Sequence, residues 1–414
     1  MRSLLRRRLL LPLFALAAVV GPAFITANVD NDAPGIATYS VAGAHYGYDV
    51  LWILWPTLLV LLVVQEISSR MGVATGKGLA DLIREEFGVK VTLVLMALLI
   101  VTNLANTAGE FAGLAEGARI FGVPRLVSVP LGAFFVWMLV LRGSYQNVER
   151  IFLVACLVYL AYPISGVLAH PDWAEVARRS VTVTLHTDLA FASTVVGIVG
   201  TTIAPWMQFY LQATVVEKGT RPSQWRLARW DVIVGSLFAI IVVFFIVIAC
   251  AATLHPAHQL ITSAGKAAGA LRPLAGKYAS TLFAIGLLNA ALFASSILPL
   301  STAYTVCEGI GWERGLDRKF RQAPHFYTLY SALIIAGAGI VLLAGERLLT
   351  IMLISQVMNG VLLPVILIMM VRLVTRRRIM EALTASRGYA ILCWVLVVLL
   401  IGLDVFLLGA TVLR

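Results

Sequence analysis

Long apolar runs recur along this chain from its beginning to its end, and they limit its fold more than any other feature. A helix needs roughly 20 apolar residues to cross a bilayer, and a spanning segment must pair its own backbone because lipid cannot. We predict eleven transmembrane helices. Their approximate bounds are 11–46, 49–69, 92–118, 126–141, 151–168, 189–216, 230–254, 278–308, 326–344, 348–371 and 389–412.

The composition excludes a soluble protein. Of the 414 residues, 60 % are hydrophobic and only 13 % are charged. Such a chain is too apolar for one soluble core and too poor in charge for a soluble surface. The predicted fold class is therefore an all-α membrane protein.

Basic residues gather on one side of the predicted membrane. With the N-terminus in the cytoplasm, the inner segments hold 23 of the 32 Lys and Arg residues, as the positive-inside rule expects. We predict a multi-pass protein of the cell inner membrane with a cytoplasmic N-terminus. The net charge of +11 faces membrane lipid and needs no nucleic acid. A cleaved signal peptide is disfavoured because its removal would delete half of the first span.

Cysteine and histidine give no sign of a resident metal or cofactor. The four cysteines have no paired spacing, and no two of the six histidines have metal-ligand spacing on one helix face within the membrane. We therefore predict no disulfide framework, no zinc site and no cofactor. An intramembrane metalloenzyme, which would need several converging ligands and a general base, is disfavoured for the same reason.

Two spans carry a proline break at mid-membrane. The pair Ala33-Pro34 recurs as Ala204-Pro205 five spans later, and interrupted helices at matching places of two halves are typical of inverted-repeat secondary transporters. We predict discontinuous spans 1 and 6 in a 5+5 inverted repeat. Residues 1–188 form the first repeat, 189–372 the second, and 373–414 an appended span.

The break in span 1 predicts a cation site. Unwinding a helix frees carbonyl groups that must line a cavity or bind a ligand. Asp32 adds a charge that costs about 2.5–3.5 kcal/mol at the bilayer centre on insertion scales, and Asp30 and Asn31 extend the polar cluster. A bound cation would satisfy these groups. The alternative is a purely structural proline kink, which accounts poorly for two symmetric breaks.

Polar side chains in two further spans are candidates for the same path. Glu110 lies in span 3 in a stripe of small residues with Gly109 and Gly113. We interpret the stripe as helix packing and the carboxyl group as functional, with a structural ion pair to Arg as the alternative. Gln356 and Asn359 lie on span 10, where a hydrogen bond between helices is their alternative role.

The sequence resembles the NRAMP family of divalent-metal transporters. The resemblance rests on Gly21-Pro22-Ala23-Phe24, Asp32, Gly43-Ala44-His45-Tyr46-Gly47-Tyr48 and Thr75-Gly76-Lys77-Gly78-Leu79-Ala80, and it continues through Ala204-Pro205 and Ser355-Gln356. It covers spans 1 to 10. It implies a LeuT-type fold with a metal held between the broken spans 1 and 6, with help from span 10.

The resemblance also implies roles for single residues. Asp32 matches the metal-binding aspartate, Gln356 the span-10 ligand, and Thr201 the residue whose backbone carbonyl coordinates the metal. Glu110 matches an acidic residue of the proton route. Thr202 and Asn359 are expected beside these ligands, together with Asp30 and Asn31.

The chain departs from the family motif at the expected metal site. Gly35 stands where the family has an amide ligand, and Ala204 stands where it has methionine. Trp206 and Gln212 replace two histidines, and Thr107 replaces an aspartate. Loss of the thioether removes a preference for softer ions, and the larger pocket suits hydrated Mg²⁺.

This pattern is similar to the NRAMP-related magnesium transporters. We predict a secondary transporter that imports hydrated Mg²⁺, and also Mn²⁺, by alternating access with weak or absent proton coupling. The alternatives are a proton-coupled Mn²⁺ or Fe²⁺ transporter of the standard NRAMP type and an amine or amino-acid transporter of the same fold. The acids Asp30 and Asp32 disfavour a substrate that bears a carboxylate. A channel fits symmetric broken helices less well, and a monomer is compatible with the sequence.

Overall fold

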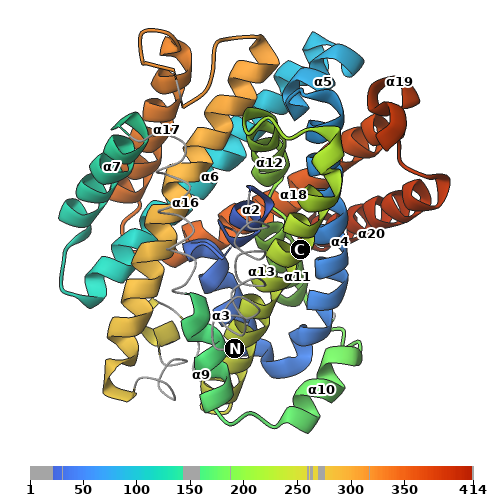
Figure 1. Ribbon diagram of the computed structural model, residues 1–414. Coiled ribbons are helices and arrows are strands. Elements are labelled where there is room, and N and C mark those ends of the chain that lie inside the picture. Colours follow the sequence, from blue (N-terminus) through green and yellow to red (C-terminus); the bar gives the residue numbers. More distant parts are fainter. Residues whose placement is uncertain are drawn as a thin grey trace, which may run out of the picture.

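The computed structural model describes residues 22–29, 31–142, 159–186, 188–258, 261, 264–268, 276–316 and 318–412. Within these ranges the chain forms helices joined by loops and has no strand. Most of the long helices run between the same two ends of the molecule (Figure 1). The all-α fold class predicted from composition and apolar runs is confirmed.

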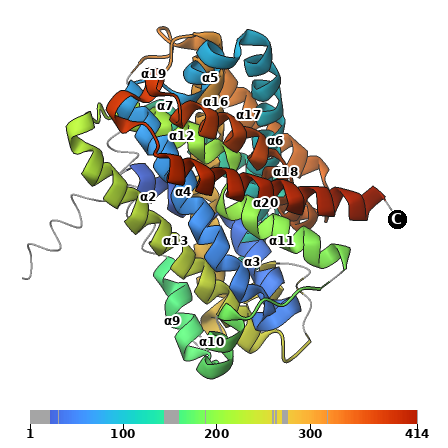
Figure 2. The same ribbon diagram turned by 90° about the vertical axis from the view of Figure 1, so that its right-hand side faces the viewer.

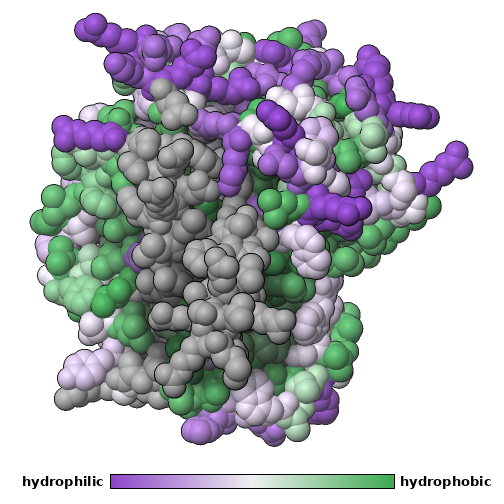
Figure 3. All heavy atoms as spheres, in the orientation of Figure 1, coloured by the Kyte–Doolittle hydropathy of each residue, from purple (hydrophilic) through white to green (hydrophobic). Residues whose placement is uncertain are grey.

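The helices are long and apolar enough to cross a membrane. Nine stretches of the described chain meet this condition, and the first of them, Ala33–Thr75, contains parts of the predicted spans 1 and 2. Predicted span 5 is described only from residue 159 onward. On the face that Figure 3 shows, hydrophobic side chains are frequent on both sides of the molecule at mid-height, and hydrophilic ones gather at the upper end. A multi-pass membrane protein is therefore the architecture of this chain.

The first half begins with a span in two pieces. These are α2 (Pro22–Val29) and α3 (Ala33–Tyr46). The 3₁₀ helix η1 (Gly47–Ile53) leads into α4 (Leu54–Thr75), which ends where Gly76 adopts a positive φ of 62° that glycine tolerates without strain. The remaining helices of this half are α5 (Leu79–Phe87), α6 (Val89–Ile120), α7 (Arg125–Arg142), α9 (Ala161–Leu168) and α10 (Trp173–Val181).

The second half repeats the broken span. Helices α11 (Leu189–Thr202) and α12 (Pro205–Glu217) form it. The long helices that follow are α13 (Trp225–Thr253), α16 (Ala279–Ile310), α17 (Pro324–Leu343), α18 (Leu348–Val374) and α20 (Arg387–Val412), with short α14 (Ala264–Ala267) and α19 (Arg377–Met380) between them. Figure 2 shows α20 running obliquely across the outside of α4 and α11.

Helix α6 packs against α7, α16, α17 and α18. Small residues make the close approach possible. A methyl group at Gly117 would lie 3.0 Å from Leu288, and one at Gly109 would lie 2.9 Å from the Pro34 ring. The stripe of small residues in span 3 is thus a packing surface, as predicted.

Two short helices lie outside the predicted spans. Helices α5 and α10 sit at opposite ends of the molecule (Figure 1). Both are strongly amphipathic. On α10, Arg179 forms an ion pair with Asp49 of η1 at 2.6 Å, so this helix is fixed to the end of the broken first span.

Candidate functional site

The first break places a carboxylate at the start of a helix. Asp32 is the N-cap of α3, and its Oδ1 accepts a hydrogen bond from the Gly35 backbone N–H at 2.6 Å. Aspartate is among the strongest N-caps, and its negative charge is stabilised by the helix dipole. Pro34 fits the first turn because the N–H that it lacks would have no partner there. Asp32 is only 5 % exposed.

A second carboxylate approaches the same break from α6. One oxygen of Glu110 accepts a hydrogen bond from the Ala33 N–H at 3.3 Å, and the carboxyl groups of Glu110 and Asp32 are close enough to interact electrostatically. Gly113 allows this approach, because a methyl group there would overlap the Ala33 Cβ. Among the described residues, neither acid forms an ion pair with a basic side chain, so the alternative pairing of Glu110 with Arg is not found.

The two acids form a charged pair that needs a proton or a cation. The second oxygen of Glu110 is buried and has no hydrogen-bond partner in the described part of the chain. Two adjacent carboxylates in a water-poor site repel each other unless one is protonated or a cation lies between them. Carboxylate oxygens are also the ligands that hard cations prefer.

The second break exposes oxygen atoms at the end of α11. Ile203 and Ala204 leave the helical conformation, with φ and ψ of −135° and 61° for Ile203 and −67° and 141° for Ala204. Pro205 has no N–H, so the Thr201 carbonyl lacks the donor that would pair it four residues later. The Thr201 hydroxyl is also buried and has no hydrogen-bond partner among the residues that the structure describes. Thr202 instead ties the break to α3 through a 2.8 Å hydrogen bond to Tyr39.

An amide network brings α18 to the site. Gln356 Oε1 accepts from Asn359 Nδ2 at 3.0 Å, and Asn359 makes two hydrogen bonds with Asn106 of α6 at 2.7 Å and 3.1 Å. These three side chains are each 1 % exposed. The network fixes the orientation of Gln356. Its two bonds between Asn106 and Asn359 join α6 to α18, which is the interhelical role that the sequence analysis gave as the alternative.

Helices α11 and α18 touch directly beside the second break. A methyl group at Gly200 would overlap the Gln356 carbonyl oxygen and the Gly360 backbone nitrogen. Only glycine permits this approach of two backbones. The contact sets Gln356 beside the turn that contains Thr201.

The remaining predicted residues differ in their contacts. Ala204 is buried at 2 % exposure, and Gly35 contributes its N–H to Asp32. Asn31 turns toward α13, where its Nδ2 donates to the Ala239 carbonyl at 3.5 Å, and it does not join the amide network. Asp30 lies outside the described residues.

Residues at the family's titratable positions have structural partners here. Gln212 donates to the Lys77 carbonyl at 2.8 Å, and Thr107 donates to the Asn103 carbonyl at 2.7 Å. Trp206 is buried, and its carbonyl accepts from Ser301. Sequence reasoning did not assign Asn106 to the site. The polar character of the middle of span 3 was the available signal.

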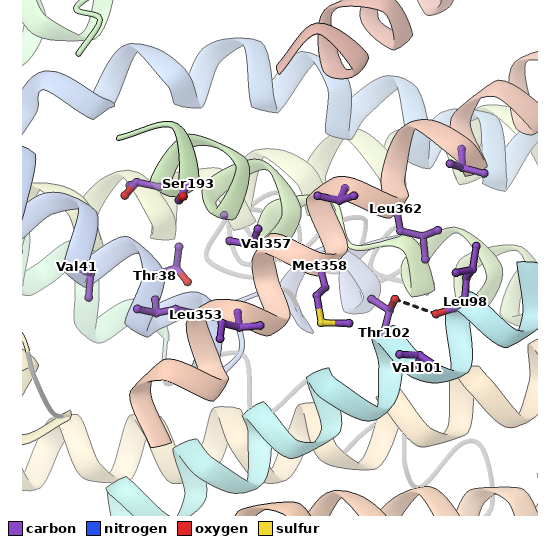
Figure 4. A pocket seen from close by; sticks show the side chains of 15 residues that line it. Thr38, Val41, Leu98, Val101, Thr102, Ser193, Leu353, Val357, Met358 and Leu362 are labelled. Carbon is purple, nitrogen blue, oxygen red and sulfur yellow. Dashed lines mark hydrogen bonds between the residues drawn. The ribbon is translucent and has the colours of Figure 1, made fainter. Parts of the chain in front are cut away.

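An apolar groove lies on the other face of α18. Its volume is about 740 Å³, and residues of α3, α6, α11 and α18 line it (Figure 4). Leu353, Val357 and Met358 line it along α18. The Thr102 hydroxyl beside them donates a hydrogen bond to the Leu98 carbonyl. The described residues of the lining include no acidic or amide side chain, so they offer no carboxylate or amide ligand for a cation.

The donor set of the site is rich in oxygen. Among the residues that the structure describes, no three His, Cys, Asp or Glu side chains gather around one metal-sized position. The described chain instead holds two carboxyl groups at the first break, and one amide and the free oxygens of one threonine where α11 meets α18. Helix α3 packs against α6, α11 and α18. Such a set suits a hard cation that retains water.

Known proteins share this architecture. The chain is similar to the solved structure of an Eremococcus coleocola manganese transporter in complex with an aromatic bis-isothiourea substituted compound, with a TM-score of 0.76 and 20 % identity over 94 % of this chain and 86 % of that chain. It is also similar to Mhp1, a nucleobase-cation-symport-1 family transporter in a closed conformation, with a TM-score of 0.58 and 16 % identity over 95 % of this chain and 90 % of that chain. The LeuT-like fold implied by the resemblance is confirmed.

The sequence itself matches a known family over most of its length. The model of the family described as natural resistance-associated macrophage protein-like matches residues 23–410. This range contains both breaks and every described residue of the candidate site. The chain therefore belongs to the Nramp family, a family of divalent-metal transporters and not of enzymes.

Proposed function

We propose that this chain imports hydrated Mg²⁺ by alternating access and that it also carries Mn²⁺, as in the magnesium-transporting branch of its family. The observation that most supports the proposal is the buried pair of Asp32 and Glu110 at the first break, which lacks a basic partner among the described residues. Ala204 at the second break supplies no thioether, and oxygen ligands without sulfur favour hard ions.

Asp32 is the charged ligand in this proposal, and Glu110 holds a proton. Asp32 accepts a short hydrogen bond from Gly35 and lies at the N-terminus of α3, and both features stabilise its anion. Glu110 is fully buried and has a single N–H donor beside the other acid. A protonated Glu110 donates a hydrogen bond to Asp32 or to water on the ion. Thr201 and Gln356 add neutral oxygens, with Thr202, Asn359 and Asn31 nearby.

Weak or absent proton coupling is part of the proposal. A proton that leaves the site needs a chain of groups that can hold it. The side chains of Gln212, Thr107 and Trp206 cannot take up or release a proton near neutral pH. Gln212 and Thr107 also donate hydrogen bonds to backbone carbonyls. No stepwise route of side chains at these positions leads away from the acid pair.

The main rival is a proton-coupled Mn²⁺ transporter. The similarity to the Eremococcus coleocola manganese transporter favours it. The methyl group of Met352 also lies near Gly113 at the first break, and a thioether there would suit a softer ion such as Mn²⁺ better than Mg²⁺. An amino-acid transporter is less favoured, because protein carboxylates already occupy the N–H groups of α3 that a substrate carboxylate would need.

Purified protein in liposomes with an internal pH dye separates these functions. With an inward Mg²⁺ gradient, we expect Mg²⁺ uptake with no acidification beyond that of empty liposomes. Mn²⁺ uptake in the same liposomes measures selectivity. Uptake of Mn²⁺ but not Mg²⁺, together with internal acidification, would establish the rival and reject our proposal.

Orientation and assembly are also proposed. The N-terminus is cytoplasmic and the membrane is the inner membrane, because Lys and Arg concentrate on one side. The two repeats at 1–188 and 189–372 each contain one break, which supports the division with 373–414 appended. A functional monomer is proposed with this division.

A further inference from the structure

A small cavity opens where three membrane spans meet away from the ion site. Its volume is about 200 Å³. Helices α4, α13 and α20 form its walls, and Figure 2 shows α20 passing across α4. Its apolar lining includes Leu62, Val232 and Ile233, and its polar lining consists of Glu66, Arg229 and Tyr389.

The acid in this cavity is already neutralised. Glu66 forms an ion pair with Arg70 through a 3.0 Å hydrogen bond from Arg70 Nε, and Tyr389 donates to its other oxygen at 2.6 Å. The Arg70 guanidinium is held over the Tyr389 ring at 4.9 Å and the Trp225 ring at 5.5 Å. Glu66 is therefore not free to pair with a further cation.

Arg229 is the unpaired charge of the cavity. It is exposed, and no carboxylate of the described residues lies within ion-pair distance of it. It lies in the second turn of α13, next to Trp230, which is 59 % exposed. Exposed Trp and Arg at the end of a span mark the level of the lipid headgroups.

The apolar wall extends from Arg229 toward the membrane interior. Val232 and Ile233 follow Arg229 by about one turn of α13, and Leu62 lies one turn before Glu66 on α4, farther from the Thr75 end of that helix. A ligand that fills this cavity needs an anionic head and an apolar tail. An anionic phospholipid has both and surrounds the protein in its membrane.

We propose that the cavity between α4, α13 and α20 binds an anionic phospholipid, with its phosphate on Arg229 and an acyl chain against Leu62 and Ile233. The site is separate from the acid pair and the second break. It also gives the appended α20 a role, because Tyr389 closes one wall and holds Glu66 away from the phosphate.

Native mass spectrometry of the full chain in detergent tests this site. With phosphatidylglycerol and phosphatidylcholine supplied together, we expect one preferentially retained phosphatidylglycerol. Arg229→Ala should weaken its retention about tenfold, or about 1.4 kcal/mol, and Arg229→Lys should restore most of it. Arg321→Ala is the matched control, because Arg321 is also exposed and has no ion pair among the described residues. This control should behave as the unchanged chain.

Two further arms separate a lipid site from a simple anion site. Ile233→Trp fills the apolar wall and should reduce phosphatidylglycerol retention while Arg229 is intact. Millimolar inorganic phosphate should not displace the lipid. Equal retention by the Arg229→Ala and Arg321→Ala variants would overturn the proposal, and so would no effect of Ile233→Trp or displacement of the lipid by phosphate. Thermal unfolding of each variant shows whether a loss reflects misfolding, and the Lys variant then decides.

Discussion

Replacing Asp32 by asparagine isolates the charge of the proposed ligand from its structural role. Asparagine caps a helix about as well as aspartate, so the amide oxygen of the variant can still accept from the Gly35 N–H that now lies 2.6 Å away. The side chain keeps its size. We therefore expect Asp32→Asn to fold and to lose only the negative charge at the first break.

The size of the expected loss follows from electrostatics. Two unit charges about 4 Å apart interact by about 4 kcal/mol at an effective dielectric constant of about 20, and a dication doubles this to about 8 kcal/mol. The neutral variant regains part of this energy, because an amide oxygen is still a ligand and no carboxylate has to be buried. If half is lost, the affinity for Mg²⁺ falls about a thousandfold.

Calorimetric titration of the purified protein with Mg²⁺ measures this change. Thermal unfolding without metal checks that the Asp32→Asn variant is folded. Asp32→Ser serves as a second capping control, because serine also caps helices well and carries no charge. If the folded Asn variant binds Mg²⁺ within about threefold of the unchanged chain, the carboxylate of Asp32 is not the primary ligand.

Three further predictions concern the surroundings of this ligand. Glu110→Gln mimics a protonated acid, so we expect liposome uptake of Mg²⁺ within about threefold of the unchanged chain; abolished uptake by a folded variant would mean that Glu110 acts as an anion. Ala204→Met adds a thioether and should strengthen Mn²⁺ or Cd²⁺ binding relative to Mg²⁺, and titration calorimetry that finds unchanged ratios would count against a role for sulfur. Gly113→Ala forces a methyl group onto the Ala33 Cβ and should destabilise the protein by about 1–3 kcal/mol; thermal unfolding measures this, and unaltered stability would show that α3 can move away at no cost.

The broken spans could be predicted because proline acts locally. Proline lacks an N–H and disfavours a helical residue before it, so Pro34 and Pro205, with the small and polar residues that precede them, reveal both breaks in the sequence. Proline alone is not sufficient, because Pro130, Pro299 and Pro364 lie inside continuous helices. The apolar runs likewise gave most span bounds to within a few residues. The short helices α5 and α10 were not predicted, because amphipathic segments of nine residues are too short and too charged to resemble a membrane span.

The partners within the site could not be predicted from local patterns. Glu110 meets the first break across 77 positions of the chain, and Asn106 meets Asn359 across 253. Such pairs depend on which faces of α6 and α18 turn toward α3. The small residues around Glu110 indicated a packed face, but no feature of the sequence indicated what it packs against.

The bare backbone contact between α11 and α18 has a consequence for movement. With no side chain between Gly200 and the turn from Gln356 to Gly360, neither helix can slide or roll along the other without a collision. We expect α11 and α18 to move as one rigid body when the protein changes between its inward-open and outward-open states. The distance from Gln356 to the freed Thr201 oxygens would then stay constant through the cycle, and access would change elsewhere.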